Sequence, residues 1–113
     1  MANVSIRIAT KEDLPVMLRL DREIFGAYGG DEDPEVIAAR LAVFPAGCAI
    51  MTTAEGLILG YLTTEKWDEV REPALNEHPA ETHRPDGKVL NITTLAIVPV
   101  AKPQARWGIA CLR

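Results

Sequence analysis

Basic and small residues follow a strongly apolar segment near the end of the chain, and together they could bind an anion. Residues 89–98 are rich in β-branched and aliphatic side chains, which predicts a strand. After a loop, an apolar helical pattern begins at Gly108. The free N–H groups and positive dipole end of a helix start favour phosphate, which small residues allow to approach closely. The candidate phosphate contacts are Lys102, Gln104, Arg106, Gly108 and Ala110.

A second group of side chains could accept or relay a proton. Glu65 and Asp68 follow an apolar segment and are candidate bases, with ordinary surface carboxylates as the alternative. His78 and His83 carry the side chain that most often exchanges protons near neutral pH, and solvated loop histidines are the alternative.

An acidic cluster occupies residues 31–33, just before Pro34. It is typical of a solvated helix start, where carboxylates favour the dipole. The alternative is that it attracts a cationic amine. The two cysteines, Cys48 and Cys111, have no metal-ligand spacing and are expected to be small buried hydrophobic residues rather than nucleophiles.

The elements that must position these residues follow from the hydrophobic pattern. Alternation predicts strands, 3–4-residue spacing predicts helices, and Asp13 and Asp33 are candidate N-caps. Gly60 lies within a predicted strand, which indicates a bulge or a close backbone approach. The segment from Glu65 to Lys88 is predicted to be a long loop. The predicted strands are 4–8, 48–53, 57–64 and 89–98, and the predicted helices are 14–25, 34–44 and one from 108.

This element order, β-α-α-β-β-β-α, predicts an α/β fold of the α+β type, with a mixed sheet and a central antiparallel hairpin. The 113 residues fit one domain. A net charge of −4 argues against nucleic-acid binding, and no apolar segment reaches the roughly 18 residues of a membrane span. Without a signal peptide or a disulfide framework, the expected location is the cytoplasm.

At this point the chain resembles the GNAT-family N-acetyltransferases. The resemblance rests on residues 6–15, on Leu95 to Pro99, and on Gly108 to Ala110. It implies that the backbone of the last strand, at Leu95, Ala96 and Ile97, pairs with the pantetheine arm of acetyl-CoA. It also implies that the following loop binds the pyrophosphate.

Three departures from the family pattern matter. Counting back from Gly108 puts Ala105 at the basic position of the loop, whereas counting forward from Ile97 puts Lys102 there. Both alignments stay open. The chain also stops at Arg113, one turn into the expected helix, so the domain is expected to be incomplete, without the strands that complete the family fold. The third departure is at Thr93, where some family members place a glutamate. Thr93 cannot act as a base, but its hydroxyl could hold a water.

The resemblance implies transfer of an acetyl group from acetyl-CoA to a small or peptide amine by direct attack. Phe25 and Tyr28 are the candidate acceptor contacts, and the open sheet edge favours a homodimer. The alternative is a non-catalytic acyl-CoA-binding or interaction module. A nucleotide-phosphate binder is less favoured, because the glycine-rich fingerprints of such proteins are missing.

Overall fold

The computed structural model describes residues 4–98 and 111–112. Within these residues the strands form one sheet in the order β1-β2-β3-β4-β5, and each neighbouring pair is antiparallel. The strands are β1 (Val4–Ile8), β2 (Ala49–Thr53), β3 (Ile58–Trp67), β4 (Val89–Ile97) and β5 (Cys111–Leu112).

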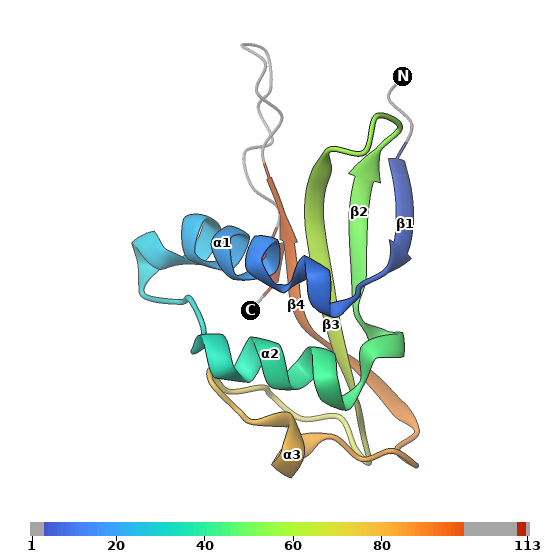
Figure 1. The fold of residues 1–113 in the computed structure, drawn as a ribbon. Helices are drawn as coiled ribbons and strands as arrows, with labels where there is room; N and C mark the ends of the chain where they lie inside the picture. Colours follow the sequence, from blue (N-terminus) through green and yellow to red (C-terminus); the bar gives the residue numbers. More distant parts are fainter. Residues whose placement is uncertain (1–3, 99–110, 113) are drawn as a thin grey trace.

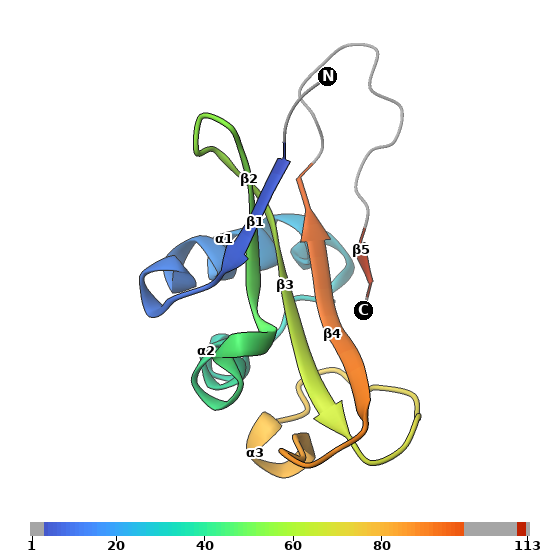
Figure 2. The same ribbon diagram turned by 90° about the vertical axis from the view of Figure 1, so that its right-hand side faces the viewer.

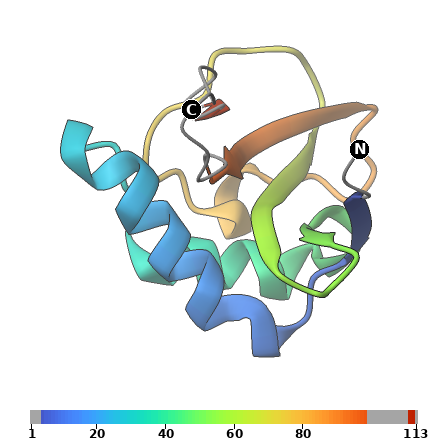
Figure 3. The same cartoon turned by 90° about the horizontal axis from the view of Figure 1, so that it is seen from above.

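The two main helices, α1 (Leu14–Phe25) and α2 (Pro34–Val43), pack on the same face of this sheet (Figures 1 and 3). The single turn of α3 (Pro79–Thr82) contacts α2. Short 3-10 turns at Lys11–Asp13, Gly26–Tyr28 and Pro45–Gly47 join these elements. The predicted α/β fold class is therefore confirmed, as are the two long helices to within a residue, but the described strands pair only antiparallel and do not form the expected mixed sheet.

Both helices begin where the sequence predicted. Asp33 caps α2 by accepting a hydrogen bond from the backbone of Glu35, and Pro34 occupies the first turn. Asp13 precedes α1 and accepts two 2.8 Å hydrogen bonds from the Arg7 guanidinium, which ties the helix start to β1. This ion pair fixes where α1 leaves the sheet.

The core lies between the helices and the sheet. Ile50, Tyr61 and Ala96 are paired in register across β2, β3 and β4, and all three are fully buried. They pack with apolar side chains of α1 and α2, including Met17, Leu20, Ile24, Phe25, Ile37 and Leu41. Burying this surface is the main favourable term in folding.

The opposite sheet face carries the alternate side chains. Ile6 pairs with Met51 and is 70% exposed, and its neighbour Ile8 is also exposed. No helix among the described residues covers this face (Figure 2). It is an apolar surface that the described part of the chain leaves open.

Gly60 confirms the prediction made for it. A bulge shifts the β2–β3 register beside it, and a Cβ on Gly60 would lie 2.1 Å from the backbone oxygen of Ala96. Only glycine lets β3 and β4 approach this closely here.

Three sequence expectations were wrong in detail. Strand β3 does not end at residue 64 but continues to Trp67, and the predicted loop after it contains α3. Cys111 and Leu112, expected in a helix, form strand β5 instead; residues 108–110 lie outside the described residues.

The described helices include none long and apolar enough to cross a bilayer.

Candidate functional site

The extension of β3 brings a carboxylate into the protein interior. Side chains alternate along a strand, so Tyr61, Thr63, Glu65 and Trp67 share the face that the helices cover. All four are buried, and Glu65 is only 2% exposed. The row begins in the apolar core at Tyr61 and ends at a pocket, which Glu65 and Trp67 line.

Strand β4 supplies the facing wall through a bulge. Thr63 pairs with Thr94 and Thr64 pairs with Ile92, so Thr93 is the extra residue in the ladder. Its hydroxyl lies 2.6 Å from that of Thr63, and Thr93 also lines the pocket. Bulges redirect side chains in this way, often beside active sites.

A buried ion pair forms the floor of the pocket. Arg40, on α2, donates to both carboxylate oxygens of Glu32, which lies just before the helix. The Nε of Arg40 lies 3.7 Å from Oε2 of Glu65, and all three side chains are at most 3% exposed. Thr94 on β4 contacts the same pair at 3.4 Å.

Glu32 is fixed from both sides. Its backbone N–H donates to Asp21 on α1, whose second oxygen accepts from the Tyr61 hydroxyl. Its Oε2 accepts a 3.0 Å hydrogen bond from the backbone of Asn76. Asn76 also accepts from the Asp33 backbone, and it adopts a left-handed conformation with φ 64°. These bonds join the loop before α2 to the loop after β3.

The loop after β3 closes the pocket. It passes outside β4 near the beginning of that strand and returns toward α2 (Figure 2), and residues 73–75 with Glu77 form one wall. Arg71 holds this loop: it stacks 4.1 Å from the centre of the Trp67 ring and donates two hydrogen bonds to Glu77. The hydrogen bonds from Arg71 are the main cause that lowers the pKa of Glu77.

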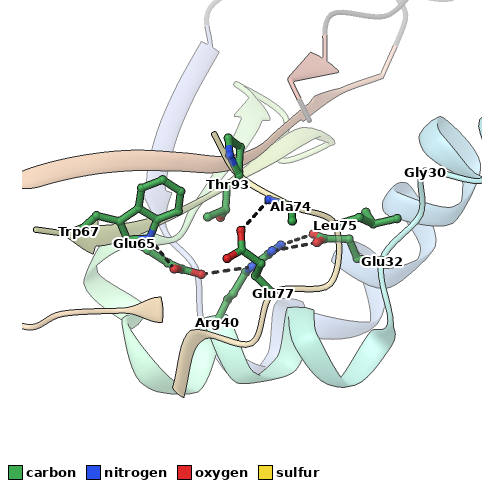
Figure 4. Close-up of a pocket in the computed structure, with 10 residues that line it drawn as sticks. Gly30, Glu32, Arg40, Glu65, Trp67, Ala74, Leu75, Glu77 and Thr93 are labelled. Carbon is green, nitrogen blue, oxygen red and sulfur yellow. Dashed lines mark hydrogen bonds and ion pairs between the residues drawn. The ribbon is translucent and has the colours of Figure 1, made fainter. Parts of the chain in front are cut away.

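The resulting pocket encloses about 260 Å³ between α2, β3, β4 and this loop (Figure 4). Glu32, Glu65 and Glu77 provide three carboxylates, and Arg40 is the cation among the lining residues. The apolar part of the wall is formed by Trp67, Pro73 and Leu75. Such a mixture of apolar wall and a few fixed polar groups is typical of a small-molecule site.

The residues predicted to accept or relay a proton lie in different places in the structure. Glu65 and Thr93 lie in the pocket, whereas Asp68 is exposed and contacts Arg84 at 3.8 Å. His78 caps α3 by accepting from the Ala80 backbone. The buried ring of His83 accepts a 3.1 Å hydrogen bond from the Lys66 backbone, so both histidines support local structure.

The predicted acceptor contacts do not line this pocket. Phe25 is buried in the apolar core, and Tyr28 is 76% exposed on the turn after α1. Their roles stay predictions. Cys48 is buried in the core; desolvation is the main cause that raises the pKa of its thiol to about 11, as expected for an unreactive structural cysteine.

The predicted pantetheine contacts Leu95, Ala96 and Ile97 lie at the end of β4. In the structure, Leu95 and Ala96 pair with Leu112 and Cys111 of β5. The predicted pyrophosphate contacts Lys102, Gln104, Arg106, Gly108 and Ala110 lie outside the described residues, so their role stays a prediction.

The sequence analysis missed Arg40 and Glu77 and did not single out Glu32 from its acidic neighbours. Arg40 carried a usable signal, because it lies between Ile37 and Leu41 on the apolar side of a predicted helix. A charged residue there requires a buried partner. Glu77, in a polar loop, had no such signal.

Solved structures of two other proteins share this architecture. The loading GNATL domain of CurA from Lyngbya majuscula superposes with a TM-score of 0.73 at 21% identity, over 90% of this chain and 51% of that one. The GphF GNAT-like decarboxylase in complex with isobutyryl-CoA gives 0.73 at 22% identity, over 88% and 51%. This chain thus spans about half the length of either. No protein-family model and no curated protein sequence matches it.

Proposed function

The chain has a GNAT-like fold, and from this fold and its acidic pocket we propose that it is an acyl-CoA-dependent N-acyltransferase domain. The expected donor is acetyl-CoA and the expected acceptor a primary amine. The observation that carries the proposal is the buried Glu65 carboxylate, which lines a pocket beside Thr93, two residues before the predicted pantetheine contact Leu95.

The donor would bind along the outer edge of β4. An extended pantetheine arm carries amide groups, so it can pair with a strand edge as another strand does. Strand β5 pairs at Leu95 and Ala96, which indicates that this edge accepts a partner. The pantetheine would replace β5 there. The structurally similar GphF domain is described in complex with isobutyryl-CoA, which supports an acyl-CoA of some kind as the donor.

Glu65 would act on the acceptor. An amine is protonated at neutral pH and must lose a proton before it attacks. In the proposed reaction the ammonium gives one proton to Glu65, directly or through a water held by Thr93. The nitrogen then attacks the thioester carbonyl, the C–N bond forms and the C–S bond breaks. The second nitrogen proton leaves with the thiolate as CoA–SH, and Glu65 releases its proton to solvent.

The carbonyl oxygen gains negative charge during this attack. A backbone N–H of β4 near Ile97 is the expected donor to it, since a fixed dipole costs no reorganisation in the reaction. No covalent enzyme intermediate is needed, in agreement with the buried position of Cys48.

A second candidate is an acyl-CoA-binding domain without amine transfer. GphF is described as a GNAT-like decarboxylase, so a protein of similar fold has a reaction other than amine acylation. This favours the second candidate. In such a protein the pocket would hold part of the acyl group instead of an amine.

The test combines binding and turnover. Titration calorimetry with acetyl-CoA and isobutyryl-CoA measures donor binding, and amine-dependent release of CoA thiol measures transfer, with the amide identified by mass spectrometry. Glu65→Gln should lower kcat/KM by about 100-fold or more, the usual contribution of a general base. Glu55→Gln, on the exposed β2–β3 turn, is the matched control. Donor binding without amide formation would favour the second candidate, and no donor binding would contradict both.

A further inference from the structure

Among the described residues, the buried ion cluster under the pocket carries more negative than positive charge. Two carboxylates, Glu32 and Glu65, share the single guanidinium of Arg40, and all three are at most 3% exposed. Two negative charges against one positive charge leave one formal negative charge away from water. Glu65 has no cation within hydrogen-bond distance among the described residues, and such a buried charge is costly, so a cation in the pocket would be favoured.

The geometry identifies the atom that such a cation would meet. Glu65 Oε1 accepts from the Trp67 indole at 2.9 Å and from the Thr82 hydroxyl at 2.5 Å. Oε2 has only Arg40 Nε, at 3.7 Å, among the described residues. That separation is too long for a hydrogen bond, and Arg40 Nε has no hydrogen-bond partner. Oε2 is therefore the acceptor left for a ligand.

Arg40 cannot hold an anionic group in return. One terminal nitrogen donates to Glu32 and Thr94, the other donates to Glu32, and the whole side chain is only 3% exposed, so little of the guanidinium is open to a ligand. Glu77 adds a further carboxylate to the wall. Glu77 is paired with Arg71, so the main like charge that a ligand carboxylate would meet is Glu65, beside a guanidinium that is already paired and buried.

The size of the pocket limits the ligand. Its volume of about 260 Å³ suits a small molecule and lies just below the range of about 300–1,000 Å³ that is typical of sites for drug-sized ligands. The apolar side chains of Trp67, Pro73 and Leu75 suit a hydrocarbon chain.

We propose that the pocket selects a small aliphatic primary amine that has one positive charge and no carboxylate, with its ammonium group on Glu65 Oε2. The role of this amine as acyl acceptor rests on the proposed function, whereas its binding does not. Glu65 therefore determines acceptor specificity in addition to accepting the proton.

The test is a titration without acyl-CoA, followed by calorimetry or by NMR shifts of the Trp67 indole N–H. Pentylamine, pentanol and ω-aminopentanoate have the same carbon skeleton but differ in charge. Pentylamine should bind saturably and at least tenfold more tightly than the other two. Equal binding of pentanol or of ω-aminopentanoate, or no saturable binding of pentylamine, would overturn the proposal.

Variants then identify the atom. Glu65→Gln should weaken pentylamine binding at least tenfold, and Glu55→Gln should leave it unchanged; retained affinity in Glu65→Gln would also overturn the proposal. If Glu65→Gln does not fold, the ligand comparison on the unaltered chain decides. Because acyl-CoA is left out, amine binding and donor binding fail independently. An amine that binds but is never acylated would contradict the proposed function alone.

Discussion

The indole N–H of Trp67 donates a 2.9 Å hydrogen bond to the carboxylate of Glu65, two residues earlier on β3. The strand itself therefore orients the side chain that faces the pocket. Thr82, on α3, donates to the same oxygen. The carboxylate is held by one donor from its own strand and one from the loop that follows.

Removing the indole N–H tests this arrangement. Trp67→Phe keeps an aromatic ring but leaves a buried carboxylate with one donor fewer. Hydrogen bonds to charged groups contribute about 1.5–3 kcal/mol, so urea unfolding should show a loss of stability in this range. Thr82→Val removes the other donor and should act in the same direction. Unchanged unfolding midpoints in both variants would mean that Glu65 does not depend on these donors.

Removing the cation of the ion cluster should cost more stability than removing one of its carboxylates. Arg40→Met removes the guanidinium that pairs with two buried carboxylates and should destabilise the chain by about 3–5 kcal/mol. Glu32→Gln leaves Arg40 paired with Glu65 alone, one charge against one, and should cost less, about 1–3 kcal/mol. Chemical denaturation at neutral pH gives both values. A larger cost for Glu32→Gln than for Arg40→Met would contradict the assignment of excess negative charge.

Asp13 should make stability depend on acid. The hydrogen bonds from Arg7 are the main cause that lowers the pKa of Asp13 to about 2 in the folded chain, against about 3.9 unfolded. Because the folded pKa is the lower one, this stability is complete above pH about 4 and is lost as the pH falls toward about 2. Asp13→Asn should remove this part of the acid dependence of the unfolding midpoint. Asp86→Asn, on an exposed turn, is the control.

Gly60 should tolerate no side chain. In Gly60→Ala the new Cβ would lie 2.1 Å from the Ala96 oxygen, so β3 and β4 must separate. Such overpacking costs about 1–3 kcal/mol or more. At Gly26 the nearest atom is 3.7 Å away and the backbone is helical, so Gly26→Ala should be neutral or slightly stabilising. Thermal unfolding of the two variants provides the comparison.

Acyl-CoA should release β5 if the pantetheine takes its place on β4. Amide hydrogen exchange of Cys111 and Leu112 should then speed up on addition of acetyl-CoA, while exchange in β3 stays slow. The opposite sheet edge, β1, serves as the internal reference. Continued protection of β5 in the fully bound chain would place the donor elsewhere.

Local patterns predicted most of the fold but little of the site. Asp33 with Pro34 predicted the start of α2, and Gly60 predicted a close approach, because these residues act through their own backbone. The extension of β3 through Trp67 was missed, since Glu65 and Lys66 are poor strand residues and the burial of Glu65 depends on α2 and the later loop. Burial of Glu32 likewise depends on Arg40, eight residues further on. Distant contacts of this kind leave no local signature.

The buried polar side chains also constrain how such a sequence can diverge. Asp21 satisfies Tyr61 and the Glu32 backbone, and Glu32 satisfies Arg40 and the Asn76 backbone. A substitution at one of these positions leaves its buried partners without a hydrogen bond. A single change is therefore disfavoured, whereas a change of both partners together is tolerated more easily. In a set of homologous chains these positions are expected to covary. The combination of residues found at them would then indicate which acceptor each chain prefers.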